Sequence, residues 1–297
     1  MPDLSTAERD SNRIIETQLD DRAATLEEAA EADVMSYLGP MYPPGDDVVK
    51  DVIEATKKGR GRRPRLMVLL ETGGGLITVA ERIARIFRHH YRRVDFVVPT
   101  YAMSAGTVLV MSGDSIYMDY ASTLGPIDPQ VRARERYVPA LGYLEQYQRM
   151  IEKSAKGGLT TAELAYFVQN FDAAELYQYE QERELSIALL EEWLVKYKFK
   201  NWKVTDKQKF KVTRAMRKAR AVQVAERLND TKRWHSHGRG IPMEMLRRDL
   251  NLLVDDFETD PKLARPVHDY FRLLQDYQGR RSHFLYVIHR KGLHVGL

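Results

Sequence analysis

The sequence predicts an α/β fold, and three observations support this class. Short apolar runs alternate with amphipathic segments between residues 31 and 130, two of the runs end in small residues, and each is followed by a helical pattern. Alternation of this kind is typical of a parallel sheet with crossover helices. With 297 residues, 43% of them hydrophobic, the chain is long enough to bury a large core.

The predicted elements follow one another regularly along this part of the chain. A strand in "ADVMSYLGPMY" comes first, and a helix in "PPGDDVVKDVIEATKKG" follows, with Val48, Val49, Val52 and Ile53 on one face. Then come the strand "RLMVLLET", the loop "GGG", the helix "LITVAERIARIFRHH", the strand "RVDFVVPT", a serine-containing turn with its helix, and the strand "SIYMDY". We therefore expect at least three strand and helix repeats.

Composition shifts divide the chain into three expected parts. Residues 1–30 are charged and lack glycine, which predicts an N-terminal arm that packs on a partner subunit or stays mobile. Residues 31–190 form the predicted core, and residues 191–297 form a basic, mainly helical C-terminal module. The segment "FDAAELYQYEQERELSIALLEEWLVKY" is expected to join the last two parts as a continuous helix.

Composition also excludes some kinds of chemistry. The chain has no cysteine, which rules out disulfides, thiolate metal sites and a thiol nucleophile. It has no apolar run near 18 residues, so we expect a soluble, cytoplasmic protein without a membrane span. A formal net charge of +4 is too small to demand nucleic acid as a partner. No cofactor or metal is predicted.

Two successive strand ends carry the residues of a predicted active site. Ser104 follows the strand that ends near Thr100, and Ala105 and Gly106 allow a sharp turn into the next helix. The amide of Ala105 then lies at a helix N-terminus, where unpaired N–H groups attract negative charge. The Gly73–Gly75 corner offers a second free amide at Gly74. Together these groups predict a serine nucleophile beside an oxyanion hole.

The same residues resemble a known family. "ETGGGLITVAERI", "YAMSAGTVLVMSGDSIYMD" and "STLGPIDPQ" are similar to the Clp protease and crotonase superfamily, whose fold is a spiral of ββα units. The closest resemblance is to the signal peptide peptidase A-like serine proteases and, within them, the serine dehydrogenase proteinase family. The resemblance implies a homo-oligomeric serine peptidase that cleaves polypeptides, with Ser104 as nucleophile and the amides of Gly74 and Ala105 as the oxyanion hole.

The general base is open to several assignments. Clp proteases carry a histidine where this chain has Asp128, and a carboxylate with an ordinary pKa near 4 is a poor base for a serine at neutral pH. Signal peptide peptidase A-like enzymes use a downstream lysine, which points to Lys156, 52 residues after Ser104, with Lys153 as the neighbouring alternative. A lysine base must be buried enough to lose its proton.

Histidines and basic residues leave further alternatives. His235 and His237 in "RWHSHGRG" suit proton transfer without burial, although they can equally cap a helix or contact phosphate. Asp128, between two prolines, reads as a turn residue or as a substrate or subunit contact. The basic C-terminal module can bind nucleic acid or a protein partner. The alternative to a serine peptidase is therefore a non-catalytic scaffold. The alternative enzymatic function is that of a crotonase-like acyl-CoA enzyme, because such enzymes use the same kind of oxyanion hole.

Overall fold

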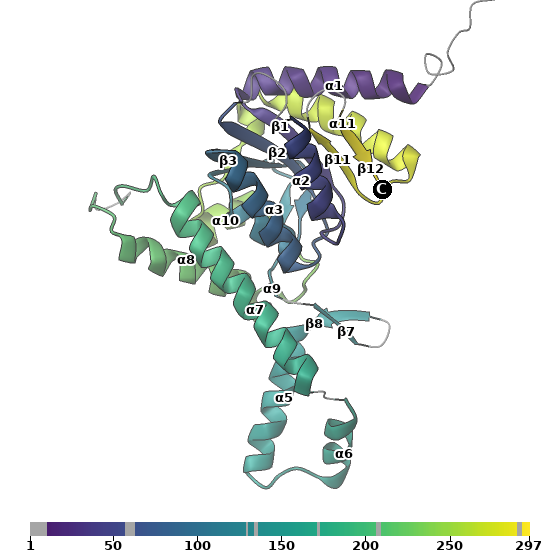
Figure 1. Ribbon diagram of the computed structural model, residues 1–297. Coiled ribbons are helices and arrows are strands. Elements are labelled where there is room, and N and C mark those ends of the chain that lie inside the picture. Colours follow the sequence, from purple (N-terminus) through teal and green to yellow (C-terminus); the bar gives the residue numbers. More distant parts are fainter. Residues whose placement is uncertain are drawn as a thin grey trace, which may run out of the picture.

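A computed structural model of the chain describes residues 11–56, 63–128, 130–133, 136–170, 173–205, 209–289 and 293–297. The described part contains a seven-stranded sheet with the strand order β10-β5-β3-β2-β1-β11-β12 (Figure 1). In that order the strands are Asp255–Asp256, Ser115–Met118, Arg93–Val98, Arg65–Glu71, Asp33–Leu38, Tyr286–His289 and His294–Gly296. The first five pair in parallel, and β11 and β12 join antiparallel. The predicted α/β class is confirmed.

Helices cover both faces of this sheet. Side chains of β2 alternate between the faces: Leu66, Val68 and Leu70 join one core cluster, and Met67 and Leu69 join the other. The first cluster includes α2 (Gly45–Thr56), α3 (Ile77–His90) and α4 (Ala105–Met111), as well as parts of later helices. The second includes α1 (Ser11–Ala30) and α11 (Ala264–Arg281). Because both faces are covered, most residues of these strands are apolar, and the interior polar residues Ser36 and Asp95 are themselves buried.

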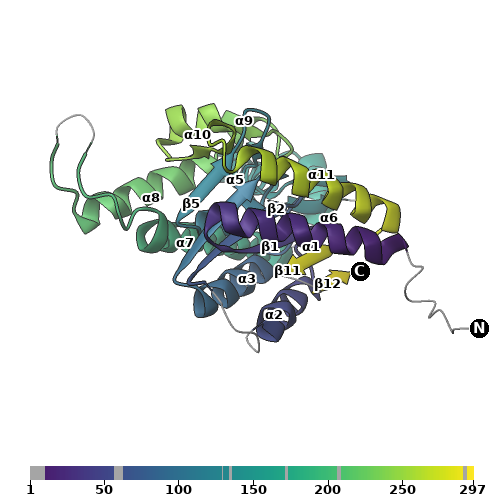
Figure 2. The ribbon, with the colours of Figure 1, turned by 90° about the horizontal axis from the view of Figure 1, so that it is seen from above.

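The N-terminal segment differs from the expected arm. Residues 11–30 form α1, which lies along α11 on one face of the sheet, as Figure 2 shows. Its buried side chains are Leu19, Ala23, Leu26 and Ala30, which recur at helical spacing. The segment packs on the core because its narrow apolar stripe contacts apolar residues of α11, more than 230 positions later. The local sequence pattern does not reveal this contact.

A helical projection follows the core strands. The hairpin of β7 (Gln130–Ala133) and β8 (Arg136–Pro139) leads into α5 (Ala140–Ala155) and α6 (Thr161–Asn170). Helix α7 (Ala173–Trp193) then runs back to the core and continues as a π-helical turn, η2 (Leu194–Lys198). Figure 1 shows α5, α6 and the first half of α7 extending away from the sheet. The continuous helix that the sequence predicted at this join is confirmed.

The C-terminal residues are helical in large part, as predicted, but they are not a separate module. The helices are α8 (Arg214–Leu228), α9 (Thr231–Trp234), α10 (Met243–Leu250), the 3₁₀ turn η3 (Phe257–Thr259) and α11. The strand β10, which precedes η3, and the strands β11 and β12, which follow α11, extend the central sheet. A second sheet joins β4 (Tyr101–Ala102), β6 (Thr123–Leu124) and β9 (Ile241–Pro242). These strands are two to four residues long, too short for a sequence period to predict.

Within the described residues, no helix is both long enough and apolar enough to span a bilayer.

Candidate active site

The two glycine and serine corners lie in direct contact. Thr72, at the end of β2, donates its N–H to the Tyr101 carbonyl at 3.2 Å, and its own carbonyl accepts the Met103 N–H at 2.9 Å. A Cβ added to Gly74 would come within 2.8 Å of both the Met103 carbonyl oxygen and the Ser104 Cβ. The corner therefore needs glycine, because any side chain at residue 74 would collide with the serine turn.

Ser104 occupies an unusual backbone position. It is the N-cap of α4, with φ 52° and ψ −121°, and its hydroxyl makes no capping hydrogen bond to the helix. A non-glycine residue with this φ is strained, and such strain concentrates at functional sites. The helix behind it packs closely on the first corner, since a Cβ on Gly106 would lie 2.3 Å from the Thr72 methyl carbon. Ser104 thus stands at a sharp, rigid turn.

A cavity of about 690 Å³ opens in front of Ser104. Its walls come from both corners, from the loop that carries Tyr42, and from α7. The lining residues are Tyr42, Gly73, Gly75, Leu76, Ile77, Thr78, Ser104, Ala105, Ile127, Gln178, Tyr179, Gln181, Glu182, Leu185, Ser186 and His237. The half-buried serine hydroxyl is therefore accessible from a pocket large enough to hold several side chains.

The backbone amides beside Ser104 differ in their hydrogen bonding. The Ala105 amide, at the first residue of α4, lies at the cavity and donates to no carbonyl of the described residues. The Gly74 N–H donates to the Thr72 hydroxyl oxygen at 3.1 Å. Gly75 lines the cavity, at φ 147°, and a Cβ there would lie 2.4 Å from the Met41 carbonyl oxygen. The glycine corner therefore offers Gly75 as well as Gly74 as a donor.

His237 and Asp128 form a buried pair at the same cavity. The His237 Nδ1 lies 3.0 Å from the Asp128 Oδ1, and the Asp128 side chain is 1% exposed. His237 lines the cavity together with Ser104, and its side chain is 18% exposed. A histidine whose one ring nitrogen is held by a carboxylate keeps the other nitrogen available to a neighbouring hydroxyl. Ser104, His237 and Asp128 are thus the residues that a serine-histidine-aspartate arrangement requires.

The β6–β9 pair explains why Asp128 meets His237. Leu124 pairs with Ile241 in antiparallel register. Asp128 lies four residues after Leu124, and His237 lies four residues before Ile241, so the same register continued outward places them opposite one another. The Ile127 N–H also donates to the Leu228 carbonyl at 3.1 Å, which ties this strand extension to the end of α8. The β6–β9 contact and the hydrogen bond to Leu228 therefore bring the two segments that carry these side chains together.

The other predicted base residues lie elsewhere. Lys156 is exposed in the turn after α5, and Lys153 pairs with Glu163 at 2.5 Å on the same projection. Figure 1 shows the link between α5 and α6 at the far end of the projection from the sheet. His235 is exposed, with φ 62°. None of these three lines the Ser104 cavity. The structure brings together Ser104, Ala105, Asp128 and His237, and it does not bring Lys153, Lys156 or His235 to them.

The wall formed by α7 was not anticipated from the sequence. Gln178, Gln181, Glu182 and Leu185 face the cavity from this helix. Polar and charged residues surround its apolar positions on all sides, so no single face of α7 is marked as functional. Only the return of α7 from the projection to the core brings this face over Ser104.

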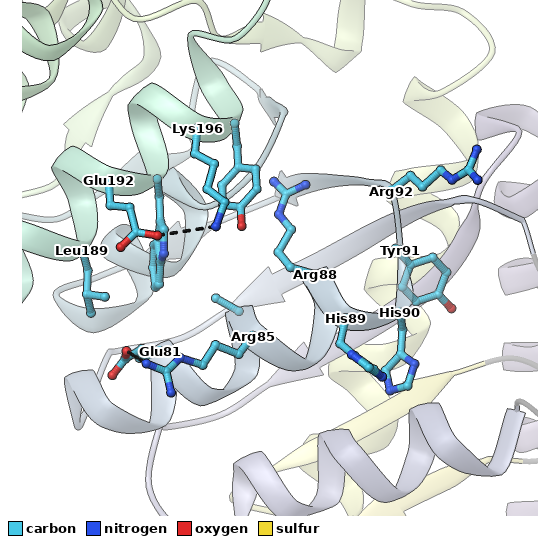
Figure 3. A pocket seen from close by; sticks show the side chains of 13 residues that line it. Glu81, Arg85, Arg88, His89, His90, Tyr91, Arg92, Leu189, Glu192 and Lys196 are labelled. Carbon is cyan, nitrogen blue, oxygen red and sulfur yellow. Dashed lines mark hydrogen bonds and ion pairs between the residues drawn. The ribbon is translucent and has the colours of Figure 1, made fainter.

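A second cavity, of about 770 Å³, lies at the opposite end of α3 (Figure 3). Two of its arginines contact a carboxylate or a ring: Arg85 pairs with Glu81 at 2.5 Å, and the Arg88 guanidinium lies 3.6 Å from the centre of the Tyr197 ring. Lys196 lies 3.6 Å from Glu192, the ion pair drawn in Figure 3. This cavity holds none of the residues that the sequence marked as catalytic.

Comparison with known proteins places this site in context. Two proteins of Methanocaldococcus jannaschii, the uncharacterized proteins MJ1495 and MJ0137, are 36% and 34% identical over 86 and 82 residues. These segments are 29% and 28% of this chain, and the chain spans only 28% of the length of each relative.

Solved structures of a 1510-N membrane-bound stomatin-specific protease are also similar. A variant in complex with a substrate peptide is 14% identical, with a TM-score of 0.42, and the match covers 75% of this chain and 73% of that one. A second variant is 12% identical, with a TM-score of 0.43 and coverages of 75% and 77%.

The family match covers the part of the chain that carries the nucleophile corner. Residues 21–166, just under half of the chain, match the family described as ClpP-like SDH-type serine proteinase. This segment includes both corners and Asp128, whereas His237 lies beyond it. The family predicted from the sequence is therefore confirmed for residues 21–166, which carry a ClpP-like SDH-type serine proteinase segment.

Proposed function

We propose that the protein is a serine peptidase in which Ser104 is the nucleophile, His237 the general base and Asp128 the residue that orients His237. The observation that carries this proposal is the 3.0 Å contact between His237 and buried Asp128 at the cavity of Ser104. The match of residues 21–166 to a serine proteinase family supports the same reaction class.

The proposed reaction proceeds in two halves. The Ser104 Oγ attacks the carbonyl carbon of a peptide, and its proton passes to the His237 Nε2. The oxyanion is stabilised by the Ala105 N–H and by a glycine N–H of the first corner. Gly75 is better supported than Gly74, whose N–H already donates to Thr72. The proton on His237 passes to the leaving amine, and water then hydrolyses the acyl-enzyme with His237 again as the base.

Asp128 acts through His237. Its carboxylate accepts the Nδ1–H of the imidazole, which fixes the tautomer that leaves Nε2 free to take the serine proton. Because Asp128 is buried and follows Ile127, whose N–H donates to the Leu228 carbonyl at the end of α8, we expect the imidazole to be held in one orientation. This arrangement gives a base that works without a buried lysine.

The mechanism with Lys156 as general base has less support. It requires the turn after α5 to approach Ser104, either by a movement of the projection or from a second copy of the chain. Lys156 is exposed and does not line the Ser104 cavity. We therefore propose Lys153 and Lys156 as residues outside the reaction.

A fluorophosphonate probe and a peptide library test the proposal. Wild-type protein should form an adduct on Ser104, and Ser104→Ala should abolish both adduct and cleavage. His237→Gln should lower kcat/KM by about 10⁴-fold or more, and Asp128→Asn by about 10³- to 10⁴-fold, because the tautomer is lost. Lys156→Ala is the matched control and should stay within about twofold of wild type.

Two results would contradict the proposed mechanism. An inactive Lys156→Ala variant with normal stability would restore the lysine base, and an active His237→Gln variant would remove the histidine. Failure of the probe to label wild-type Ser104 would contradict serine catalysis as such and would favour the scaffold alternative.

We also propose that the protein is a homo-oligomer acting on polypeptides. Large apolar side chains are exposed on the projection, where Leu164 is 53%, Tyr166 59% and Tyr177 64% exposed. Such a surface is typical of a contact between subunits. Light scattering on the purified protein checks the assembly. Nucleic acid as a partner and a cytoplasmic location stay predictions from the sequence.

A further inference from the structure

Three metal-binding side chains from distant parts of the chain converge at the β10 edge of the sheet. Asp119 follows β5, Glu258 lies in η3, and His268 lies on α11. One ligand atom from each lies within 4.8 Å of the other two. The residues are up to 149 positions apart, so the tertiary fold alone brings them together.

Asp119 is held by donors that leave part of its carboxylate free. It is 5% exposed. Its Oδ1 accepts the Ala121 N–H at 2.9 Å, the Ser122 N–H at 2.7 Å and the Ser122 hydroxyl at 2.6 Å. All hydrogen bonds that described residues donate to this carboxylate end on Oδ1, which leaves Oδ2 for another ligand. Donors behind a ligating carboxylate are the usual means of orienting it toward a metal.

His268 and Glu258 approach Asp119 from the solvent side. The His268 Nε2 lies 3.3 Å from the Glu258 Oε1, and the two side chains are 31% and 38% exposed. The His268 ring packs edge to face on fully buried Phe257, with 5.4 Å between ring centres. The Glu258 N–H donates to the Asp256 carboxylate at 3.0 Å, which fixes the start of η3. The histidine is therefore oriented by packing, and the ligand atoms stay accessible to an ion.

We propose that Asp119, Glu258 and His268 form a binding site for a divalent cation of the zinc type. One imidazole nitrogen and two carboxylate oxygens form a donor set that Zn²⁺ accepts, with water completing the coordination. The imidazole disfavours Mg²⁺ and Ca²⁺, which prefer ligands made of oxygen alone. The site is separate from the Ser104 cavity, since it shares no residue with it.

The proposed ion would connect three segments of the fold. Asp119 begins the loop that enters β6, Glu258 follows the edge strand β10, and His268 belongs to α11, on one face of the sheet. A ligand that binds the folded chain and not the unfolded chain raises stability in proportion to the logarithm of its concentration. The ion would therefore stabilise the sheet edge without taking part in the serine reaction.

Calorimetry with zinc chloride on the full-length, chelator-treated protein tests the proposal. Wild type should bind one equivalent, and the thermal midpoint should rise with zinc concentration. His268→Ala should weaken binding at least 100-fold and should remove the zinc-dependent rise in the midpoint. Ser122→Ala, which removes one donor behind Asp119, should weaken binding about 10- to 100-fold. His89→Ala, at an exposed histidine on α3, is the control and should bind as wild type does.

Three outcomes would overturn the proposal: wild type that binds no zinc, His268→Ala that binds as tightly as wild type, or equal losses in His268→Ala and His89→Ala. If His268→Ala does not fold, Glu258→Gln replaces it, because a half-exposed side chain in a short turn can be changed without disturbing the core. Normal zinc affinity in Glu258→Gln would count against the site in the same way.

Discussion

The strained backbone of Ser104 lowers the stability of the fold by an amount that a single substitution can measure. A φ of 52° with a ψ of −121° suits glycine, whereas a Cβ at this position opposes it. The surrounding contacts hold the residue there: the Gly106 N–H donates to the Met103 carbonyl at 2.8 Å, and the first turn of α4 packs on Thr72. Strain of this kind exposes a hydroxyl that would otherwise pack into the turn.

Replacing Ser104 by glycine should therefore stabilise the fold. We expect the free energy of unfolding of Ser104→Gly to exceed that of Ser104→Ala by about 1 kcal/mol, because only glycine relieves the strained φ. Urea denaturation of the two inactive variants measures the difference. Equal stability of the two variants, or a more stable alanine variant, would show that the turn is unstrained.

The proposed nucleophile is easier to predict from the sequence than the proposed base. Ser104 and the glycine corner could be predicted because each signal is local: small residues directly after an apolar strand. His237 is one of two histidines that the sequence offers as a base, and Asp128 reads as a turn residue or as a substrate or subunit contact. Their pairing could not be predicted, since it depends on the two-residue contact between β6 and β9, which joins segments more than 100 residues apart.

At the scale of elements, α7 gives the cavity its charge. Among the side chains that line the cavity in the described part of the chain, Glu182 is the one carboxylate, and the Gln178 amide donates to it at 3.1 Å. The opposite wall is largely apolar, with Leu76, Ile77 and Ile127. A carboxylate facing a half-enclosed cavity attracts a cationic side chain of a bound peptide.

The proposed peptidase should therefore prefer peptides with lysine or arginine beside the scissile bond. Glu182→Gln should lower kcat/KM for such peptides about tenfold, which corresponds to about 1.4 kcal/mol, and should leave neutral peptides within about twofold. Glu180→Gln, on the same helix but outside the cavity, is the matched control. Equal losses for charged and neutral peptides would contradict this role for Glu182.

At the scale of the whole molecule, one lysine lies among carboxylates from three separate segments. Lys198, at the end of η2, lies near Asp255 of β10, Asp95 of β3 and Asp114, which directly precedes β5. Burial lowers the pKa of the Lys198 amine from 10.5 to about 8, although these carboxylates act in the opposite direction. The native state therefore binds this proton less tightly than the unfolded chain does.

This difference predicts the pH dependence of stability. Below pH 8 both states carry the proton and the folded chain bears the full cost of burying it, whereas between pH 8 and 10.5 the unfolded chain binds more protons, so stability rises with pH. Lys198→Met should raise the free energy of unfolding at pH 7 by up to about 3 kcal/mol, with a smaller gain at pH 9.5. Denaturation at both pH values checks this.

Lys200→Met is the control for that experiment. The Lys200 amine contacts the Asp114 carboxylate, so its removal should destabilise the fold at pH 7. A gain from Lys198→Met that is the same at both pH values would contradict the linkage, because it would then come from packing alone.

The overall architecture was predictable only where contacts are local. The strands β1, β2, β3 and β5 are four to seven residues long and mostly apolar, so the parallel core follows from the sequence. The remaining strands of the sheet return from residues 255–296, and α1 packs on α11 from the other end of the chain. Such pairings depend on tertiary context, which a local pattern does not contain.

The late position of His237 also has a consequence during synthesis. The ribosome makes Ser104 first and the proposed base 133 residues later, so roughly 7 to 27 s pass between them at ordinary elongation rates. Until β9 emerges and pairs with β6, the nascent polypeptide holds a nucleophile with no proton acceptor beside it. If the proposed mechanism holds, a growing chain is therefore unable to cleave itself or its neighbours before His237 has been made.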